Sequence, residues 1–199
     1  MKNSSTDKPN AQRNGWKLLG TDYPYSHPMF RLRRDRLNLP NGSEGIFTYV
    51  EKGPAVFVIP ITPEGEIVLI RQFRYVADRW SWEIPAGGSH DFDGEDLADL
   101  ARRELWEEIG GTAKALRHLG TFCGASGVLS QTFHVYLAED VQLSDQHLEA
   151  TEVIEVHPMP LDRALELMRD GDADAFDAYV LLRYAPLLRA LVSKANEPS

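Results

Sequence analysis

The sequence has little of what several protein classes require. It contains one cysteine, Cys123, in 199 residues, which excludes an internal disulfide and a zinc site built from cysteines. No apolar run approaches the roughly 18 residues of a membrane-spanning helix, and the N-terminus lacks the apolar segment of a signal peptide. We therefore expect a cytoplasmic protein with no membrane partner.

Positive charge is also scarce. The 21 Lys and Arg residues are outnumbered by 30 Asp and Glu residues, so the formal net charge is −9. General nucleic-acid binding needs a basic surface, and this balance argues against it. The 43% apolar content is enough for the core of one domain with a small extension.

The order of hydrophobic patterns predicts three regions. Residues 1–14 are polar and without periodicity, which is typical of a mobile tail. Residues 15–52 alternate in the manner of strands and predict a small antiparallel β unit. Alternating arginines in this unit, at Arg31 and Arg33, usually mark a water-facing strand surface, with phosphate binding as the alternative. Residues 53–199 form the main domain.

The main domain alternates strands and helices. The continuous apolar run at 55–61 predicts a buried central strand, and a Pro-Glu-Gly turn predicts a hairpin to 67–70. Further strands are expected at 80–84, 116–122, 132–137 and 153–156, with amphipathic helices at 161–169 and 177–192. This pattern predicts an α/β/α sandwich with a mixed sheet.

The most informative stretch is 87–111, which opens with a Gly pair and continues as an acidic helix. Glu104 and Glu108 are i and i+4, so they lie on one face, at the edge of the apolar sector. Glu107 is close to both, and Arg103 can pair with it. A solvated acidic face is the ordinary explanation. A hard divalent cation with oxygen ligands would equally relieve the repulsion.

The spacing of this stretch resembles the Nudix box, G-x5-E-x7-R-E-U-x-E-E-x-G-U, in which U is apolar. Six polar or glycine positions match in register: Glu95, Arg103, Glu104, Glu107, Glu108 and Gly110. The final apolar position is Gly111, and the opening glycine is displaced because Ser89 occupies its place. We expect a longer loop here, with His90–Asp93 as the added length. The box implies the Nudix form of the predicted sandwich.

The resemblance implies a metal-dependent hydrolase that cleaves a diphosphate linked to a nucleoside. It implies Mg²⁺ or Mn²⁺ as the cofactor. Its ligands would be the backbone carbonyl of Ala86 and the side chains of Glu104, Glu107 and Glu108. Glu107 is also a candidate catalytic carboxylate. Such ligands suit a hard cation that neutralises phosphate charge and activates water.

Flanking motifs are similar to those of the branch that hydrolyses ADP-ribose and nucleotide sugars. Arg71 and Arg74 end a predicted central strand, and a guanidinium suits a diphosphate; a surface salt bridge is the alternative for each. Glu83 ends an apolar strand and needs a partner or a ligand. These three residues are our candidate substrate-binding residues.

The catalytic base is expected on the loop between residues 140 and 153. Relatives carry a Glu-x-Glu pair there, and Glu152 matches its second position. Ala150 occupies the first, so this carboxylate is missing, and the adjacent Glu149 is the substitute. His147 is also nearby, although a single loop histidine is usually solvated.

The resulting hypothesis is hydrolysis of a nucleoside diphosphate sugar, with ADP-ribose first and GDP-mannose or a related sugar as the alternative. A Nudix module that senses ADP-ribose without cleaving it is the alternative from another class. The intact Glu104, Glu107 and Glu108 favour the enzyme. The small β unit has little apolar surface of its own to bury, so we expect a homodimer formed through it.

Overall fold

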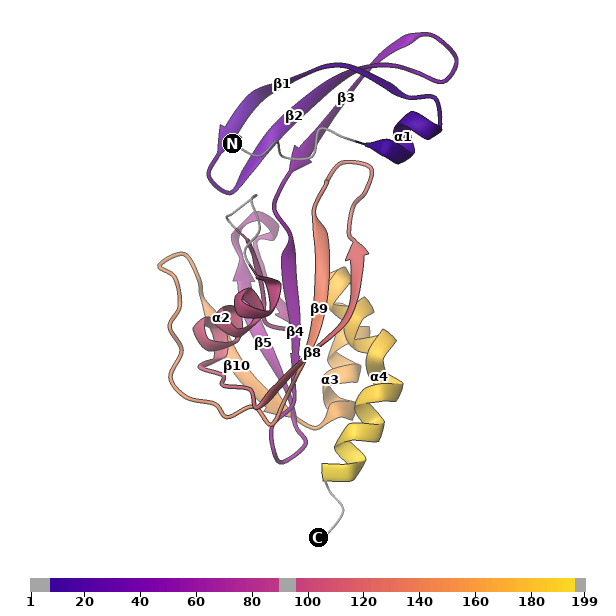
Figure 1. The fold of residues 1–199 in the computed structure, drawn as a ribbon. Helices are drawn as coiled ribbons and strands as arrows, with labels where there is room; N and C mark the ends of the chain where they lie inside the picture. The colour runs from indigo at the N-terminus through magenta and orange to yellow at the C-terminus, as the bar shows by residue number, and fades with distance from the viewer. Residues whose placement is uncertain (1–7, 90–95, 196–199) are drawn as a thin grey trace. The chain divides into compact units, whose positions relative to one another are not determined.

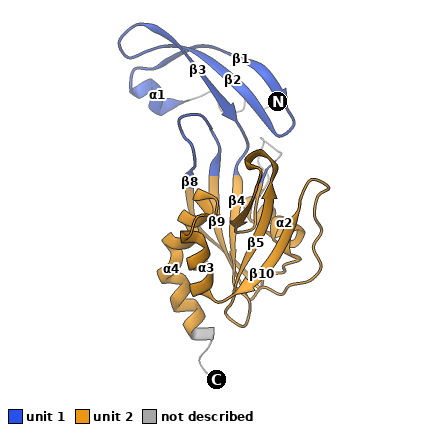
Figure 2. Ribbon diagram, turned by 180° about the vertical axis from the view of Figure 1, so that it is seen from behind, with its two compact units in different colours: residues 1–54, 88–95, 122–132 blue, residues 55–87, 96–121, 133–199 orange. Residues whose placement is uncertain are grey.

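The computed structural model describes residues 8–89 and 96–195 (Figure 1). The chain divides into two compact units (Figure 2). Unit 1 comprises residues 1–54, 88–95 and 122–132, and unit 2 comprises residues 55–87, 96–121 and 133–199. Unit 1 therefore extends beyond the N-terminal segment and includes a hairpin tip from further along the chain.

Unit 1 is built on an antiparallel sheet with the order β1-β2-β3. Its strands are β1 (Lys17–His27), β2 (Phe30–Asn38) and β3 (Glu44–Glu51). The predicted N-terminal antiparallel unit is therefore confirmed. A short helix, α1 (Pro9–Arg13), lies within the segment expected to be a mobile tail. Proline in the first turn of this helix fits, because its missing N–H would have no helical partner there.

The interior of unit 1 holds charged side chains. Arg33 is 1% exposed, although alternating arginines predicted a water-facing surface. Its guanidinium donates to Asp35 at 2.8 Å and to Glu51 at 3.0 Å. Asp35 also accepts from Thr21 at 2.7 Å and from the Tyr49 hydroxyl at 3.1 Å. Because two carboxylates neutralise Arg33, its burial needs no phosphate ligand.

Unit 2 has strands between helices, as predicted. Its strands are β4 (Ala55–Pro60), β5 (Ile67–Arg74), β6 (Arg79–Glu83), β7 (Ala86–Gly88), β8 (Ala115–Cys123), β9 (Thr132–Glu139) and β10 (Ile154–Met159). The ends of β7, β8 and β9 extend into unit 1. Its helices are α2 (Leu97–Ile109), α3 (Leu161–Arg169) and α4 (Ala175–Ala195), and a short 3₁₀ turn, η1 (Tyr75–Ala77), joins β5 to β6.

The strands form two sheets, with the orders β7-β4-β9-β8 and β10-β5-β6. β4 and β9 are parallel, so the predicted mixed sheet is confirmed. The predicted hairpin between 55–61 and 67–70 is wrong, because β4 and β5 lie in different sheets and share one bridge, Ile61 to Ile67. Residues on both faces of β4 and of β5 are buried. Each of the two strands is paired along both edges with other strands of its own sheet.

Helices cover both sides of these strands (Figure 1). Val56 and Val58 of β4 and Ile70 of β5 pack in one cluster with Leu100 and Leu105 of α2. On the opposite face of β4, Phe57 lies 4.6 Å from the ring of Phe176 in α4, measured between centroids. Successive strand residues point to opposite faces. The α/β/α sandwich predicted from the element order is therefore confirmed.

Within the described residues, no helix combines the length and the apolar character that a bilayer span would need.

The first turn of α4 carries a buried carboxylate. Asp177 is 2% exposed and accepts a 2.9 Å hydrogen bond from the backbone N–H of Ile84. Burial raises the pKa of Asp177 well above its usual range, and the charge of Glu83 raises it further. Between its unfolded and folded pKa values the folded protein holds more protons, so stability falls as pH rises through this window.

We predict that Asp177→Asn raises the melting temperature at pH 8 by roughly 2–4 °C for each kcal/mol recovered, with a smaller effect at pH 4. The asparagine keeps an oxygen for the Ile84 N–H and removes the desolvated charge. Thermal unfolding between pH 4 and pH 8 measures this effect. The exposed Asp170→Asn serves as the control and should show no such trend. A lower melting temperature for Asp177→Asn at pH 8 would contradict the prediction.

Candidate active site

The site is built on α2, whose ends are defined by local chemistry. The Asp96 side chain accepts from the Ala98 N–H at 2.8 Å and so caps the first turn. At the other end Gly110 adopts φ +62°, and the Gly111 N–H donates to Leu105 O at 2.9 Å. A left-handed glycine is a common helix stop. The box glycine at Gly110 therefore ends the acidic helix.

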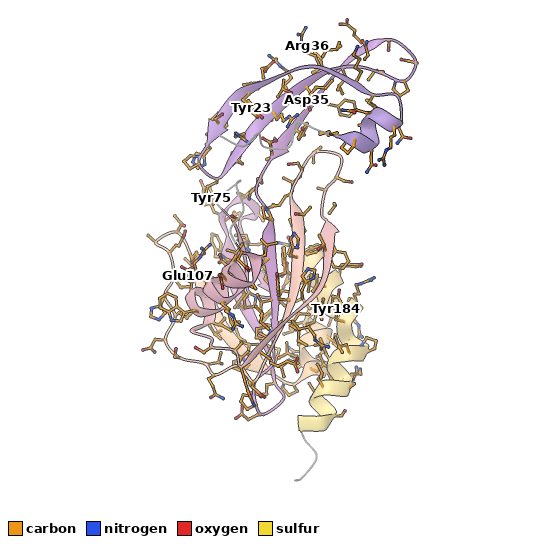
Figure 3. All side chains as sticks on the ribbon, in the orientation of Figure 1. Tyr23, Asp35, Arg36, Tyr75, Glu107 and Tyr184 are labelled. Atoms are coloured by element: carbon orange, nitrogen blue, oxygen red, sulfur yellow. The ribbon has the colours of Figure 1, made fainter. Side chains whose placement is uncertain are left out.

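The three glutamates predicted on this helix differ in environment. Glu104 is 9% exposed and Glu108 is 2% exposed, whereas the Glu107 side chain is 28% exposed. Figure 3 labels Glu107 on α2. The predicted i,i+4 pair is present, with Arg103 Nε 3.8 Å from Glu107 Oε2. Two of the carboxylates are therefore largely removed from water, and Arg103 lies between Glu107 and Glu104, with its Nη2 3.5 Å from Glu104 Oε1.

Burial makes these carboxylates poor acids. It raises the pKa of Glu104 to about 7, helped by the charge of Glu107 and opposed by Arg103. Burial also raises the pKa of Glu108 well above its usual range, although a backbone hydrogen bond from Ala86 works in the other direction. The charged pair is therefore costly in the protein alone.

Strand β7 lies directly against the carboxylates of Glu104 and Glu108. The Ala86 N–H donates to Glu108 Oε2 at 2.9 Å. A Cβ placed on Gly87 would lie 2.1 Å from the carboxyl carbon of Glu104. Only a glycine leaves room for that carboxylate. The close approach explains the Gly at 87, which the sequence motif alone assigned to a displaced loop glycine.

Arg74 and Glu83 lie on the α2 side of the β10-β5-β6 sheet. Ile70, which packs against α2, pairs directly with Glu83 across the sheet, so both side chains share one face. Arg74 makes a bidentate ion pair with Glu83, with its Nε 2.8 Å from Oε1. Arg74 also lowers the pKa of Glu108, against the larger effect of burial. These residues therefore adjoin the carboxylate site.

Arg71 lies on the other face of the same sheet. It is one residue from Ile70 and pairs with Trp82 in register, so its side chain points away from the α2 core. Its guanidinium lies 5.4 Å from the Trp80 ring and 5.8 Å from the Trp82 ring. Of the two candidate arginines, the structure brings Arg74 to the carboxylates and gives Arg71 two aromatic partners.

The two candidate bases form one turn. Glu152 Oε2 accepts from the Glu149 N–H at 2.9 Å, and the Glu152 N–H donates to Glu149 O at 3.0 Å. The charge of Glu152 is among the influences that raise the pKa values of Glu104 and Glu108, after burial and nearer groups. Glu152 is half-buried and Glu149 is exposed. The charge of Glu152 therefore acts on the helix carboxylates, while its own carboxylate closes the turn.

The donor set fits a hard divalent cation. All the available ligands are oxygens, two of them on buried carboxylates whose pKa values are raised, and Gly87 of β7 leaves space beside the Glu104 carboxylate. Over residues 8–89 and 96–195, no three His, Cys, Asp or Glu side chains are grouped as a ready-made metal cluster. Glu107 faces Arg103 instead, so it would have to turn to join the other two.

Glu95 of the box and the loop residues His90–Asp93 lie outside the described residues.

Known proteins resemble this chain in sequence and fold. The NUDIX domain family matches residues 51–181. An ADP-ribose pyrophosphatase from Bacillus subtilis (strain 168) is 34% identical over 178 residues, which are 88% of this chain and 95% of the relative. A CMP-5'-(N-acetyl-N-hydroxy-3-aminopropyl)phosphonate hydrolase from Streptomyces rubellomurinus is 38% identical over 136 residues, which are 68% of this chain and 65% of the relative.

A solved structure described as an ADP compounds hydrolase has the same fold. It aligns with a TM-score of 0.75 at 21% identity, over 88% of this chain and 95% of that chain. The family match covers more than half of the chain and includes the whole acidic helix. The chain therefore belongs to the Nudix family and is a Nudix pyrophosphatase, a hydrolase that acts on phosphoric anhydrides.

The close approach of Gly87 to Glu104 gives a test of the carboxylate site. We predict that Gly87→Ala displaces the flexible Glu104 carboxylate, keeps the fold, and weakens Mg²⁺ binding about 10- to 100-fold. The rise in melting temperature with Mg²⁺ concentration measures the affinity. Gly88→Ala is the matched control, because its Cβ would meet only the Gln131 amide, at 3.6 Å. Equal Mg²⁺ responses in the two variants would contradict the prediction.

Proposed function

We propose that the protein hydrolyses the diphosphate bond of a nucleoside diphosphate sugar. ADP-ribose is the substrate that we propose first. The products would be AMP and ribose 5-phosphate. The observation that carries the proposal is the pair of buried carboxylates, Glu104 and Glu108 of α2, held against Ala86 and Gly87 of β7. The activity in the name of the Bacillus subtilis relative supports the choice of ADP-ribose.

The proposed cofactor is Mg²⁺ or Mn²⁺. The Ala86 carbonyl and the carboxylates of Glu104, Glu107 and Glu108 would hold it. When bound, such an ion neutralises charge on the diphosphate oxygens and lowers the pKa of water. The crowding of Glu104 and Glu108 supports this assignment, because a cation removes the repulsion that their burial creates.

The chain's own residues would bind the diphosphate and move one proton. Arg74, held by Glu83 beside Glu108, is the proposed diphosphate ligand. Glu152 takes a proton from the water that attacks phosphorus, and the bond from that phosphorus to the bridging oxygen breaks. The sequence favoured Arg71 over Arg74 for the diphosphate. The place of Arg71 beside Trp80 and Trp82 favours a structural role.

The bond that is cleaved tests the reaction. With Mg²⁺, ADP-ribose should give AMP and ribose 5-phosphate, measured by chromatography, and GDP-mannose should be cleaved more slowly. Glu108→Gln should lower kcat by several orders of magnitude, because a neutral amide is a poor ligand for a hard cation. Release of ADP and free ribose would exclude this mechanism. Tight binding of ADP-ribose without turnover would favour a sensing module.

The base is tested by two matched substitutions in one turn. Glu152→Gln should lower kcat by about 10²-fold or more with little change in KM, because general-base catalysis typically contributes about 10²–10⁴-fold. Glu149→Gln should cost less, since its side chain is exposed. Single-turnover rates with ADP-ribose measure both. If Glu149→Gln lowers kcat more than Glu152→Gln does, the base is Glu149. If both variants keep the original kcat, the base is another residue.

We also propose a homodimer in which residues 15–52 form the contact and residues 53–199 form the hydrolase domain. Unit 1 exposes large apolar side chains, including Ile46 at 63% and Phe47 at 46%, which is typical of an interaction surface. Light scattering should give twice the 22.4 kDa chain mass. Ile46→Glu should lower this mass to that of one chain, and a monomeric unmodified protein would contradict the proposal.

A further inference from the structure

The loop that carries the candidate base is attached to the end of the acidic helix. The Ser144 hydroxyl donates to Gly110 O at 2.8 Å, and its backbone N–H donates to the same oxygen at 3.1 Å. The Gln146 side-chain amide donates to Glu108 O at 2.6 Å. The His147 N–H donates to Glu107 O at 2.8 Å. Three carbonyls at the C-terminus of α2 therefore receive donors from one short segment.

These contacts supply hydrogen-bond donors to carbonyls at the C-terminus of α2. The last carbonyls of a helix have no partner within it, and α2 has no basic residue in its last turn to supply one. The segment lies so close that a Cβ on Gly110 would be 2.3 Å from Ser144 O. The His147 ring also stacks on Trp106, with centroids 3.7 Å apart and planes at 15°. The attachment is therefore tight as well as polar.

Gln146 differs from the other contacts because it reaches two elements at once. Its amide nitrogen also lies 3.4 Å from the backbone oxygen of Ile154, the first residue of β10. Glu108 is a buried carboxylate of the site, and Ile154 follows Glu152 by two residues. One side chain thus links the backbone of a candidate metal ligand to the strand that follows the candidate base.

The turn that holds Glu152 lies between these two attachments. Its own hydrogen bonds, between Glu149 and Glu152, close the turn locally but do not connect it to α2. On its far side, Ile154 is paired with Gln72 in the sheet. Val153 O also accepts from the Phe73 N–H at 3.1 Å, so the sheet holds one side of Glu152. The contacts of Gln146 and its neighbours hold the other side against α2 and thereby contribute to the distance from Glu152 to the helix carboxylates.

We propose that Gln146 is a positioning residue, which holds the 144–153 loop on the C-terminus of α2 and thereby sets the place of the Glu152 carboxylate. The inference rests on the proposed function in taking Glu152 as the base. Gln146 itself does not touch substrate or reacting atoms. Its effect on turnover acts through Glu152, and it leaves the ligands of α2 and their affinity for Mg²⁺ unchanged.

The first test replaces the amide with an apolar side chain of similar length. Gln146→Met should lower kcat for ADP-ribose about 10- to 100-fold, because a displacement of about 1 Å at a reacting group can cost 10²-fold. KM and the Mg²⁺ concentration for half-maximal rate should stay within about twofold of their original values. Gln142→Met is the matched control, since Gln142 bonds Thr112 through its backbone and its side chain is exposed.

A double-mutant cycle separates positioning from a general loss of structure. In a Glu152→Gln background, Gln146→Met should cause no further loss of kcat, because the group that it positions is already disabled. An equal loss in both backgrounds would mean that Gln146 acts on the helix or the fold and would overturn the proposal. Unchanged kcat for Gln146→Met in the original background would overturn it as well.

Hydrogen exchange distinguishes this inference from the proposed function. Amides of residues 147–153 should exchange faster in Gln146→Met than in the unmodified protein and in Gln142→Met, and unchanged exchange would overturn the proposal. A fully active Glu152→Gln variant would instead remove Glu152 from the proposed mechanism. Faster exchange would then still support Gln146 as the residue that holds the loop.

Discussion

Two buried carboxylates on one turn of α2 impose the constraint on which the site depends. Glu104 and Glu108 lie at the edge of the apolar face that packs against β4 and β5, so both are largely shielded from water. The protein offers them a backbone N–H from Ala86 and an open space at Gly87. Arg103 and Arg74 supply positive charge nearby, but the pKa values of both carboxylates stay raised by burial. The site is therefore organised to receive a cation together with an anionic substrate.

The alternation of β5 separates two arginines that the sequence places three residues apart. Arg74 shares its face with Ile70 and Glu83 and lies near Glu108, whereas Arg71 lies beside two indole rings on the opposite face. Side chains in a strand change face at every residue, so a spacing of three puts two residues on opposite sides. The motif favoured Arg71 as the ligand, whereas the strand geometry puts Arg74 on the face of the carboxylates.

In unit 1 the charged strand β2 is the central strand of its sheet, and its Arg33 side chain is buried. Arg33 is buried because Asp35 and Glu51 accept its donors, and Tyr49 and Thr21 complete the bonding of Asp35. Such a network is costly to desolvate, and its partners must all be present for it to be tolerated. Three of these partners stand on neighbouring strands, Thr21 on β1 and Tyr49 and Glu51 on β3. The alternating arginines by themselves could not reveal which strand would supply the carboxylates.

The sequence by itself determined the acidic helix, its buried face and its glutamates, because a 3.6-residue period and a spaced motif are local properties. Nearly every strand and helix followed from local pattern too. Only the tertiary structure decided that β4 and β5 enter different sheets, that Arg74 rather than Arg71 meets the carboxylates, and that Gln146 links α2 to β10. Each depends on which distant segment becomes a neighbour, and pairing across long loops leaves no signal in the residues of one segment.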